Sequence, residues 1–98
     1  ELAWTNIDAV VRCWDGPRHL PFREHPTQKP IGLMQWCIER LKLAPDALIV
    51  DPYCGSGTTG VAAVQMGHRF LGIEREASYC EIARRRIAGA AAQGRLAL

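Results

Sequence analysis

The fold is decided by residues 47–75, which read ALIVDPYCGSGTTGVAAVQMGHRFLGIER. Residues 47–50 form an apolar run of strand length, and residues 69–73 form a second one after a helix-length segment. Gly67 is suited to the left-handed position that follows a helix. The stretch therefore predicts a strand, a glycine-rich turn, a helix and a second strand, with Glu74 at its carboxyl end. Because open α/β sheets bind ligands at the carboxyl ends of their strands, a ligand site is expected there.

The turn between the first strand and the helix follows the pattern G-x-G-x-x-G at residues 55–60. Glycine permits tight turns and close approach of a ligand to the backbone. The free N–H groups at the start of the predicted helix, 58–66, favour electron-rich ligand atoms. Glu74 lies 17 residues after Gly57, near the position of a carboxylate that accepts hydrogen bonds from ribose hydroxyls. The pattern predicts a nucleotide-type cofactor site; a purely structural turn is the alternative.

The residues between the first strand and the first glycine indicate which cofactor suits the turn. Dinucleotide-binding turns place the first glycine directly after the strand, whereas here four residues intervene, beginning with Asp51. A carboxylate beside the turn repels a pyrophosphate and attracts a sulfonium or ammonium group. S-adenosylmethionine carries both of these groups and no phosphate, so we expect it to be the cofactor. A phosphate-binding loop of the Walker type is excluded because no Lys follows the glycine turn.

Three motifs in a fixed order resemble one family of enzymes. The chain reads HPTQKP at residues 25–30, DPYCGSGTT at residues 51–59 and GIE at residues 72–74. This arrangement resembles the DNA amino-methyltransferases, which use S-adenosylmethionine to methylate adenine N6 or cytosine N4. It is similar to the circularly permuted group, whose catalytic region comes first. The resemblance implies an α/β, Rossmann-like methyltransferase fold with a partial sheet flanked by helices, DNA as the partner of the complete enzyme, and a role in restriction-modification.

The resemblance also implies cofactor-binding roles for ten residues. Glu74 would accept hydrogen bonds from the ribose hydroxyls, and Arg75 would lie beside the adenine. Thr27 and Lys29 would close the methionine end, with Lys29 reaching the cofactor carboxylate. A carboxylate favours cations and N–H donors, and vicinal hydroxyls favour a carboxylate, so the assignments are chemically consistent. The methionine part and the sulfonium would be surrounded by residues of the turn: Asp51, Tyr53, Gly55, Ser56, Gly57 and Thr58.

The family's catalytic motif has no match in this chain. That motif is Asp, Asn or Ser followed by two prolines and an aromatic residue; it holds the target amino group and stacks the extruded base. Residues 51–53 lack the second proline and lie in the cofactor turn, and residues 14–17 fit no better. We therefore expect the carboxyl-terminal part of such an enzyme, with no catalytic residue of its own. We also expect an exposed apolar sheet edge, covered by the missing catalytic half or by a second copy.

Length and composition are typical of one folded domain, 1–98, with a modest core. The net charge of +2 is too small to indicate nucleic-acid binding by itself. No apolar run approaches about 18 residues and no signal-like segment is present, so we expect a soluble, cytoplasmic protein without membrane contact. The four cysteines form no C-x-x-C pair, so we expect no metal site. They could form two disulfides, but the methyltransferase resemblance implies a reducing cytoplasm and therefore free thiols.

The predicted domain has three parts. Residues 1–15 read as strands, and residues 16–30 read as a proline-rich loop that contains HPTQKP. Residues 31–93 form the cofactor-binding α/β unit. Two other functions stay open for this unit, namely an NAD-type Rossmann fragment and a non-catalytic remnant that binds DNA or a partner. Adenine N6 is preferred over cytosine N4 only as the commoner target in the family, because no residue of the chain discriminates between them.

Two further helices are predicted beside the central unit. Apolar residues at helical spacing predict a helix over 31–43 that packs on the sheet. Ser78 and Glu81 form a capping box, which predicts that a third helix begins there. Residues 94–98 would fray or add an edge strand. The basic run 84–86 reads as a solvated face of the third helix, with contact to DNA phosphates as the alternative.

Overall fold

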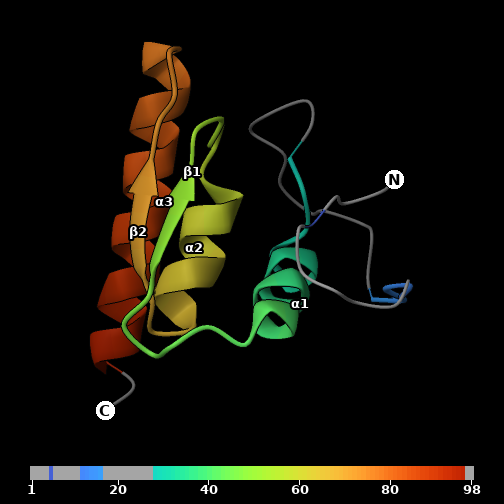
Figure 1. Cartoon of the computed structure of the whole chain (residues 1–98). Helices are drawn as coiled ribbons and strands as arrows, with labels where there is room; N and C mark the ends of the chain where they lie inside the picture. Colours follow the sequence, from blue (N-terminus) through green and yellow to red (C-terminus); the bar gives the residue numbers. More distant parts are fainter. Residues whose placement is uncertain (1–4, 6–11, 17–27, 97–98) are drawn as a thin grey trace.

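The computed structural model describes Thr5, residues 12–16 and residues 28–96. The elements of the described chain (Figure 1) are, in order, α1 (Ile31–Leu41), β1 (Leu48–Asp51), α2 (Thr58–Gln65), β2 (Arg69–Gly72) and α3 (Ala77–Leu96). Their central part is the strand, helix and strand that the sequence predicts over 47–75. Every helix of the described residues is too short or too polar to cross a bilayer.

The strands β1 and β2 lie side by side as a parallel pair (Figure 1), which confirms the predicted pairing. Leu48 pairs with Arg69 at one end of the ladder, and Asp51 pairs with Gly72 at the other. The pairing continues past the strands, because the Ile73 N–H donates to the Asp51 carbonyl at 2.9 Å. Both strands therefore end at the same edge of the sheet, where the sequence predicts the ligand site.

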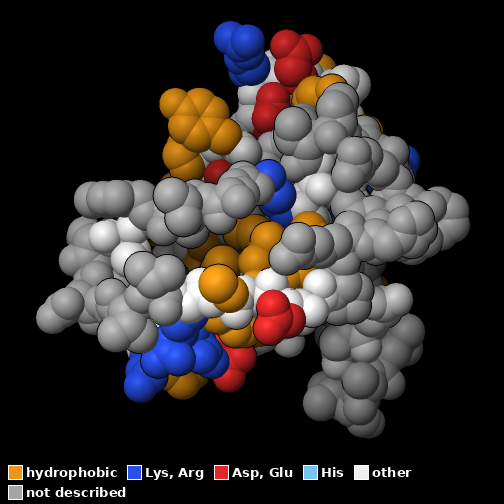
Figure 2. Space-filling view, turned by 90° about the vertical axis from the view of Figure 1, so that its right-hand side faces the viewer, with side chains coloured by type: hydrophobic (Ala, Val, Ile, Leu, Met, Phe, Trp, Pro, Cys, Tyr) orange, Lys and Arg blue, Asp and Glu red, His pale blue; other side chains and the backbone are white. Residues whose placement is uncertain are grey.

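Helix α2 is the centre of the packing, since it contacts α1, α3 and both strands. Ala62 and Ala63 of α2 are completely buried, and Ile38 of α1 packs against them. Ile49 and Phe70 extend this core from the sheet. The small side chains of α2 let its neighbours approach closely, so a helix of eight residues can serve as the common support. Seen from the α1 side, apolar side chains gather near the middle of the described surface, with charged ones around them (Figure 2).

The sheet face turned away from α2 is apolar and exposed in the described structure. Leu48, Val50, Leu71 and Ile73 keep 49%, 52%, 51% and 54% of their surface accessible. Alternate residues of a strand point to the same side, so these four side chains share one face. The sequence predicts an exposed sheet edge, whereas the structure exposes this face, because α1 and α3 pack on α2 and not across the sheet.

Two helix boundaries differ from the prediction. The helix predicted over 31–43 ends two residues earlier, because Lys42 takes a left-handed conformation with φ 51°. Helix α3 begins at Ala77, so Ser78 lies inside its first turn and does not cap it. The reason is that the Glu76 carbonyl already accepts a helical hydrogen bond, at 3.0 Å.

The two ends of the chain also differ from the prediction where the structure describes them. Helix α3 continues through Leu96, so the frayed or strand-like tail expected at 94–98 is wrong for its described residues. The alanine-rich sequence before it explains this, because Ala is the strongest helix former. Of the strands expected at 1–15, the described residues Thr5 and 12–15 belong to no helix or strand, and the others lie outside the described residues.

Replacing Gly57 by Ala should lower the free energy of unfolding by about 2–5 kcal/mol. Gly57 has a left-handed φ of +86°, and an added Cβ would lie 2.9 Å from the Cβ of Ala83 in α3. Gly67→Ala is the matched control, because Gly67 has φ +83° with open space around it, and we expect a loss of about 1–2 kcal/mol. Urea unfolding followed by circular dichroism measures both losses, and equal values would contradict the close packing of the turn on α3.

Candidate cofactor-binding site

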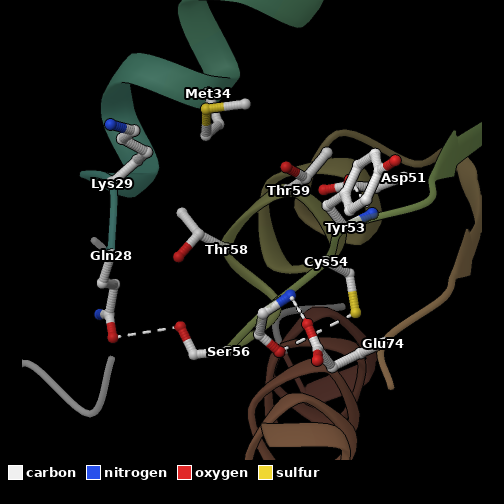
Figure 3. A pocket seen from close by; sticks show the side chains of 11 residues that line it. Gln28, Lys29, Met34, Asp51, Tyr53, Cys54, Ser56, Thr58, Thr59 and Glu74 are labelled. Carbon is white, nitrogen blue, oxygen red and sulfur yellow. Dashed lines mark hydrogen bonds between the residues drawn. The ribbon is translucent and has the colours of Figure 1, made fainter. Parts of the chain in front are cut away.

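A hollow of about 350 Å³ opens at the carboxyl ends of β1 and β2 and extends to the start of α1. One side is built from residues before and within α1, and the other from the end of β1, the turn after it and Glu74, two residues after β2 (Figure 3). The start of α2 contributes two threonines. The complete lining is Gln28, Lys29, Met34, Asp51, Tyr53, Cys54, Gly55, Ser56, Thr58, Thr59 and Glu74.

The turn after β1 is fixed by its glycines and by local hydrogen bonds. Gly55 and Gly57 have φ values of 54° and 86°, in the left-handed region that glycine adopts readily. The Tyr53 N–H donates to the Asp51 carboxylate at 3.1 Å, and the Gly57 N–H donates to the Cys54 carbonyl at 2.8 Å. The Asp51 carboxylate is thereby held at the hollow by a well-bonded backbone.

The Glu74 carboxylate joins three segments of the chain. Its Oε1 accepts from the Gly55 N–H at 3.0 Å, and its Oε2 accepts from the Glu76 N–H at 2.8 Å. These bonds tie the end of β2 to the turn after β1 and to the start of α3. An ionised carboxylate offers about four acceptor sites, so it can accept several hydrogen bonds at once. Because Glu74 lines the hollow, it can also accept hydrogen bonds from the hydroxyls of a ligand.

Opposite charges lie on the two sides of the hollow. Figure 3 shows Lys29 on the α1 side, and Asp51 and Glu74 on the side of the strand ends. A ligand that carries a carboxylate at one end and a cation with hydroxyls at the other fits this distribution. A pyrophosphate fits it poorly, because its negative charge would face two carboxylates.

Arg86 of α3 supports the turn by hydrogen bonds to its residues. Its Nη1 donates to the Ser56 carbonyl at 2.7 Å, to the Ser56 Oγ at 3.0 Å and to the Thr58 Oγ1 at 3.2 Å. Ser56 and Thr58 are buried, with 3% and 6% of their surface exposed. The prediction of a solvated basic face at 84–86 is therefore wrong for Arg86. Arg84 does stay exposed, beside Glu81.

The Cys54 thiol lies in the hollow and is a weak nucleophile. Burial raises the pKa of Cys54 above its ordinary value, and the negative charges of Asp51 and Glu74 raise it further. The thiol therefore stays protonated at neutral pH, and only the thiolate is reactive. Among the described residues, no group of three or more His, Cys, Asp or Glu side chains is placed to hold a metal ion.

Most of the predicted cofactor residues come together in the structure. Gly57 does not line the hollow, because it is buried behind the turn against α3. Arg75 is exposed and also outside the lining, and Thr27 lies outside the described residues. The seven predicted residues that line the hollow are Lys29, Asp51, Tyr53, Gly55, Ser56, Thr58 and Glu74.

Five contributors to the site were given no cofactor-binding role from the sequence. One is Cys54, which lies in the turn between the assigned Tyr53 and Gly55. Gln28 lies inside the HPTQKP motif between two assigned residues, and Thr59 follows the assigned Thr58, so their positions were the available signal. Met34 lies one helical turn after the same motif and reaches the hollow from α1. Arg86 lies three residues after the buried Ala83, which places it near the packed side of α3.

Several known proteins are similar to this chain. The type II methyltransferase M2.DpnII of Streptococcus pneumoniae is 42% identical over 88 residues, which cover 86% of this chain and 29% of that protein. TTHA0409 of Thermus thermophilus, in a complex with S-adenosyl-L-methionine, superposes with a TM-score of 0.59 at 32% identity, over 64% of this chain and 26% of that one. The M1.HpyAVI–SAM complex gives a TM-score of 0.57 at 32% identity, over 76% and 41%. This chain thus spans less than half the length of each.

These similarities confirm the predicted fold and the predicted family. The solved relatives share the α/β arrangement at more than 30% identity, so the Rossmann-like methyltransferase fold is the correct one. The family model for DNA methylases of the N6/N4 type matches residues 4–85. That match contains the HPTQKP motif, the glycine turn and Glu74. The chain therefore belongs to the DNA methylase family.

Proposed function

We propose that this chain is the S-adenosylmethionine-binding part of a DNA methyltransferase that acts on the exocyclic amine of adenine (N6) or cytosine (N4). The observation that carries the proposal is the Glu74 carboxylate, which two backbone N–H groups fix in a hollow that Lys29 also lines. Membership of the DNA methylase family supports it. The names of the relatives, a type II methyltransferase and a complex with S-adenosyl-L-methionine, support it as well. DNA as the substrate also implies a cytoplasmic location.

Each end of the cofactor has a matching group in this proposal. Glu74 accepts hydrogen bonds from the ribose hydroxyls, and Asp51 faces the sulfonium and the ammonium. Lys29, together with Thr27, binds the carboxylate of the methionine end. Arg75, next in sequence to Glu74, lies beside the adenine. The residues of the turn that surround the methionine part are Tyr53, Gly55, Ser56 and Thr58, whereas Gly57 packs the turn against α3.

The role of these residues in the reaction is orientation. When bound, S-adenosylmethionine supplies a methyl group that is activated by the positive sulfur. Glu74 would hold the ribose and Lys29 the methionine end, so the direction of the methyl group is set from both sides. The target amine belongs to an extruded base, which the family's catalytic motif holds in another part of the enzyme. This division of labour explains why a cofactor site is present without a catalytic residue.

Two alternative functions have less support. A dinucleotide would bring a pyrophosphate to the turn, where Asp51 and Glu74 would repel it. Docking to DNA through residues 84–86 would need three solvated arginines, but Arg86 is bonded to Ser56 and Thr58. The methyltransferase cofactor site, in contrast, gives a consistent role to Asp51, Glu74 and Arg86.

Calorimetric titration with S-adenosylhomocysteine should give one site per chain, and Glu74→Gln should weaken binding at least about tenfold. A hydrogen bond to a charged group contributes about 1.5–3 kcal/mol, which is the basis of this expectation. Glu76→Gln is the matched control, because the Glu76 side chain does not line the hollow and only its N–H bonds to Glu74. NADH should not bind, and binding of NADH without binding of S-adenosylhomocysteine would refute the proposal.

Alkylation of Cys54 by iodoacetamide should report on the same hollow. Because its pKa is raised, the native thiol should react more slowly at neutral pH than in the urea-unfolded chain, and the rate should rise as the pH approaches the raised pKa. Asp51→Asn removes one of the charges that raise the pKa, so it should speed the reaction at fixed pH. S-adenosylhomocysteine should protect Cys54 but not the exposed Cys13, as read by peptide mass spectrometry. Equal labelling of Cys54 with and without this ligand would contradict the proposed site.

We also propose that the exposed apolar sheet face is covered, either by the catalytic half of the complete enzyme or by a second copy. Residues 1–98 form one domain in this proposal, with 31–93 as its cofactor-binding unit. The face consists of side chains that are about half exposed, and covering each of them contributes on the order of 1 kcal/mol. M2.DpnII is more than three times as long as the segment it shares with this chain, so a protein of that type has ample chain to cover the face.

The chain alone should self-associate through this sheet face. Size-exclusion chromatography with light scattering should show a mass that rises with concentration. Replacing Val50 and Leu71 together by Thr keeps strand-forming residues but removes apolar surface, so it should return the chain to a monomer. Leu41→Gln is the control, because Leu41 is exposed to a similar extent, 43%, but lies on α1. A parent chain that stays monomeric at all concentrations would contradict coverage by a second copy.

A further inference from the structure

The Ser56 hydroxyl lies between two side chains that come from distant parts of the sequence. Arg86 Nη1 donates to the Ser56 Oγ at 3.0 Å, and the Ser56 Oγ lies 3.2 Å from the Gln28 Oε1. A guanidinium has donors only, so the hydroxyl must accept from Arg86. The single hydroxyl proton of Ser56 is then free to be donated to the Gln28 Oε1, and the observed hydrogen bond runs in this direction. The bonds form a relay with a fixed direction, from Arg86 through Ser56 to Gln28 (Figure 3 shows its second bond).

The relay connects three elements that meet at the hollow. Arg86 belongs to α3, Ser56 belongs to the glycine turn, and Gln28 precedes α1. Gln28 is followed by Lys29, which lines the hollow, and by Pro30, whose carbonyl accepts from the Met34 N–H at 3.3 Å. Fixing Gln28 therefore fixes the start of α1 relative to the turn, and with it the backbone from which the Lys29 side chain extends.

We infer that Arg86, Ser56 and Gln28 position residues 28–30 against the glycine turn, and that Arg86 is thereby a positioning residue for the methionine end of the cofactor. This inference rests on the function proposed above. It deepens that function, because it gives a role to Arg86, which lies outside the hollow, and to Gln28, which had no cofactor-binding role in the sequence analysis. Arg86 would act through Ser56 and Gln28 and would touch no reacting atom.

The burial of the relay supports a positioning role. Ser56 is only 3% exposed, so water cannot easily replace either of its partners. Arg86 also donates to the Ser56 carbonyl and to Thr58 Oγ1 at the first residue of α2. Its positive charge thus adds to the positive end of the α2 dipole. A carboxylate at the methionine end is stabilised by this combined positive potential.

A pair of ligands distinguishes positioning from general support of the fold. S-adenosylhomocysteine carries the methionine end, whereas 5′-methylthioadenosine lacks it and keeps the adenosine. Gln28→Leu removes the acceptor of the relay and leaves the other side chains of the hollow chemically unchanged. By calorimetry it should weaken S-adenosylhomocysteine about 3- to 10-fold, the usual effect of one hydrogen bond, and change 5′-methylthioadenosine less than about twofold. Arg86→Gln should act in the same way, and Arg84→Gln, on the exposed side of α3, should change neither affinity.

Two outcomes would overturn the inference while the proposed cofactor site stands. Equal weakening of both ligands by Gln28→Leu would mean that the relay only supports the fold. Unchanged binding of both would mean that the relay does not form. A parent chain that binds neither ligand would instead refute the proposed function.

If the parent chain binds neither ligand, the relay can still be tested by measuring stability without ligand. Urea unfolding of Ser56→Ala, Gln28→Leu and the double variant should give losses that are not additive, because either single change breaks the same bond. Arg86→Gln and Gln28→Leu should be coupled as well, through the shared hydroxyl. Additive losses in both pairs would overturn the relay, whether or not a cofactor binds.

Discussion

The hydrogen bond from the Gly55 N–H to the Glu74 carboxylate is the contact on which the site depends. It joins residues 19 positions apart, one in the turn after β1 and the other after β2. Two backbone bonds lie beside it, from the Cys54 N–H to the Ile73 carbonyl at 3.0 Å and from the Ile73 N–H to the Asp51 carbonyl at 2.9 Å. A carboxylate acceptor makes the first bond stronger than a neutral pair. The place of the carboxylate and the shape of the turn therefore cannot change independently.

The central strand–helix–strand unit could be predicted because its determinants are local. Gly67 has the left-handed φ of +83° that was expected after the helix, and the apolar runs on either side have strand length. The ligand edge followed from the parallel order of the strands alone. The residues that line the hollow could be assigned because the motifs lie at the strand ends. Of the assigned residues that the structure describes, Gly57 and Arg75 lie outside the lining, and Gly57 packs against α3 instead.

The remaining features depend on contacts between distant residues, so the sequence could not show them. Three consecutive arginines look alike, and only the fold directs Arg86 to a carbonyl 30 positions away at Ser56. The start of α3 is similar: the capping box at Ser78 is locally plausible, but the Glu74 carboxylate binds the Glu76 N–H and the helix begins earlier. For Arg86 the acceptor is distant in sequence. For α3 the acceptor lies only two residues from Glu76, but the distant Gly55 N–H also binds it. The Ser56 carbonyl belongs to the glycine turn and the Glu74 carboxylate is bonded to that turn, which is why both errors lie near the site.

In the proposed site, the double use of Glu74 would couple folding to ligand binding. The carboxylate that closes the turn is also the group that would receive the ribose hydroxyls, so the cofactor can bind well only where the turn is formed. A ligand that binds only the folded state stabilises it by about 2.7 kcal/mol at a concentration 100 times its dissociation constant. That is a large share of the stability of a small domain, and the core of the described residues is small: its completely buried side chains are the alanines of α2. The cofactor would therefore complete the packing at the strand ends, as the rest of the enzyme would complete it on the open face of the sheet.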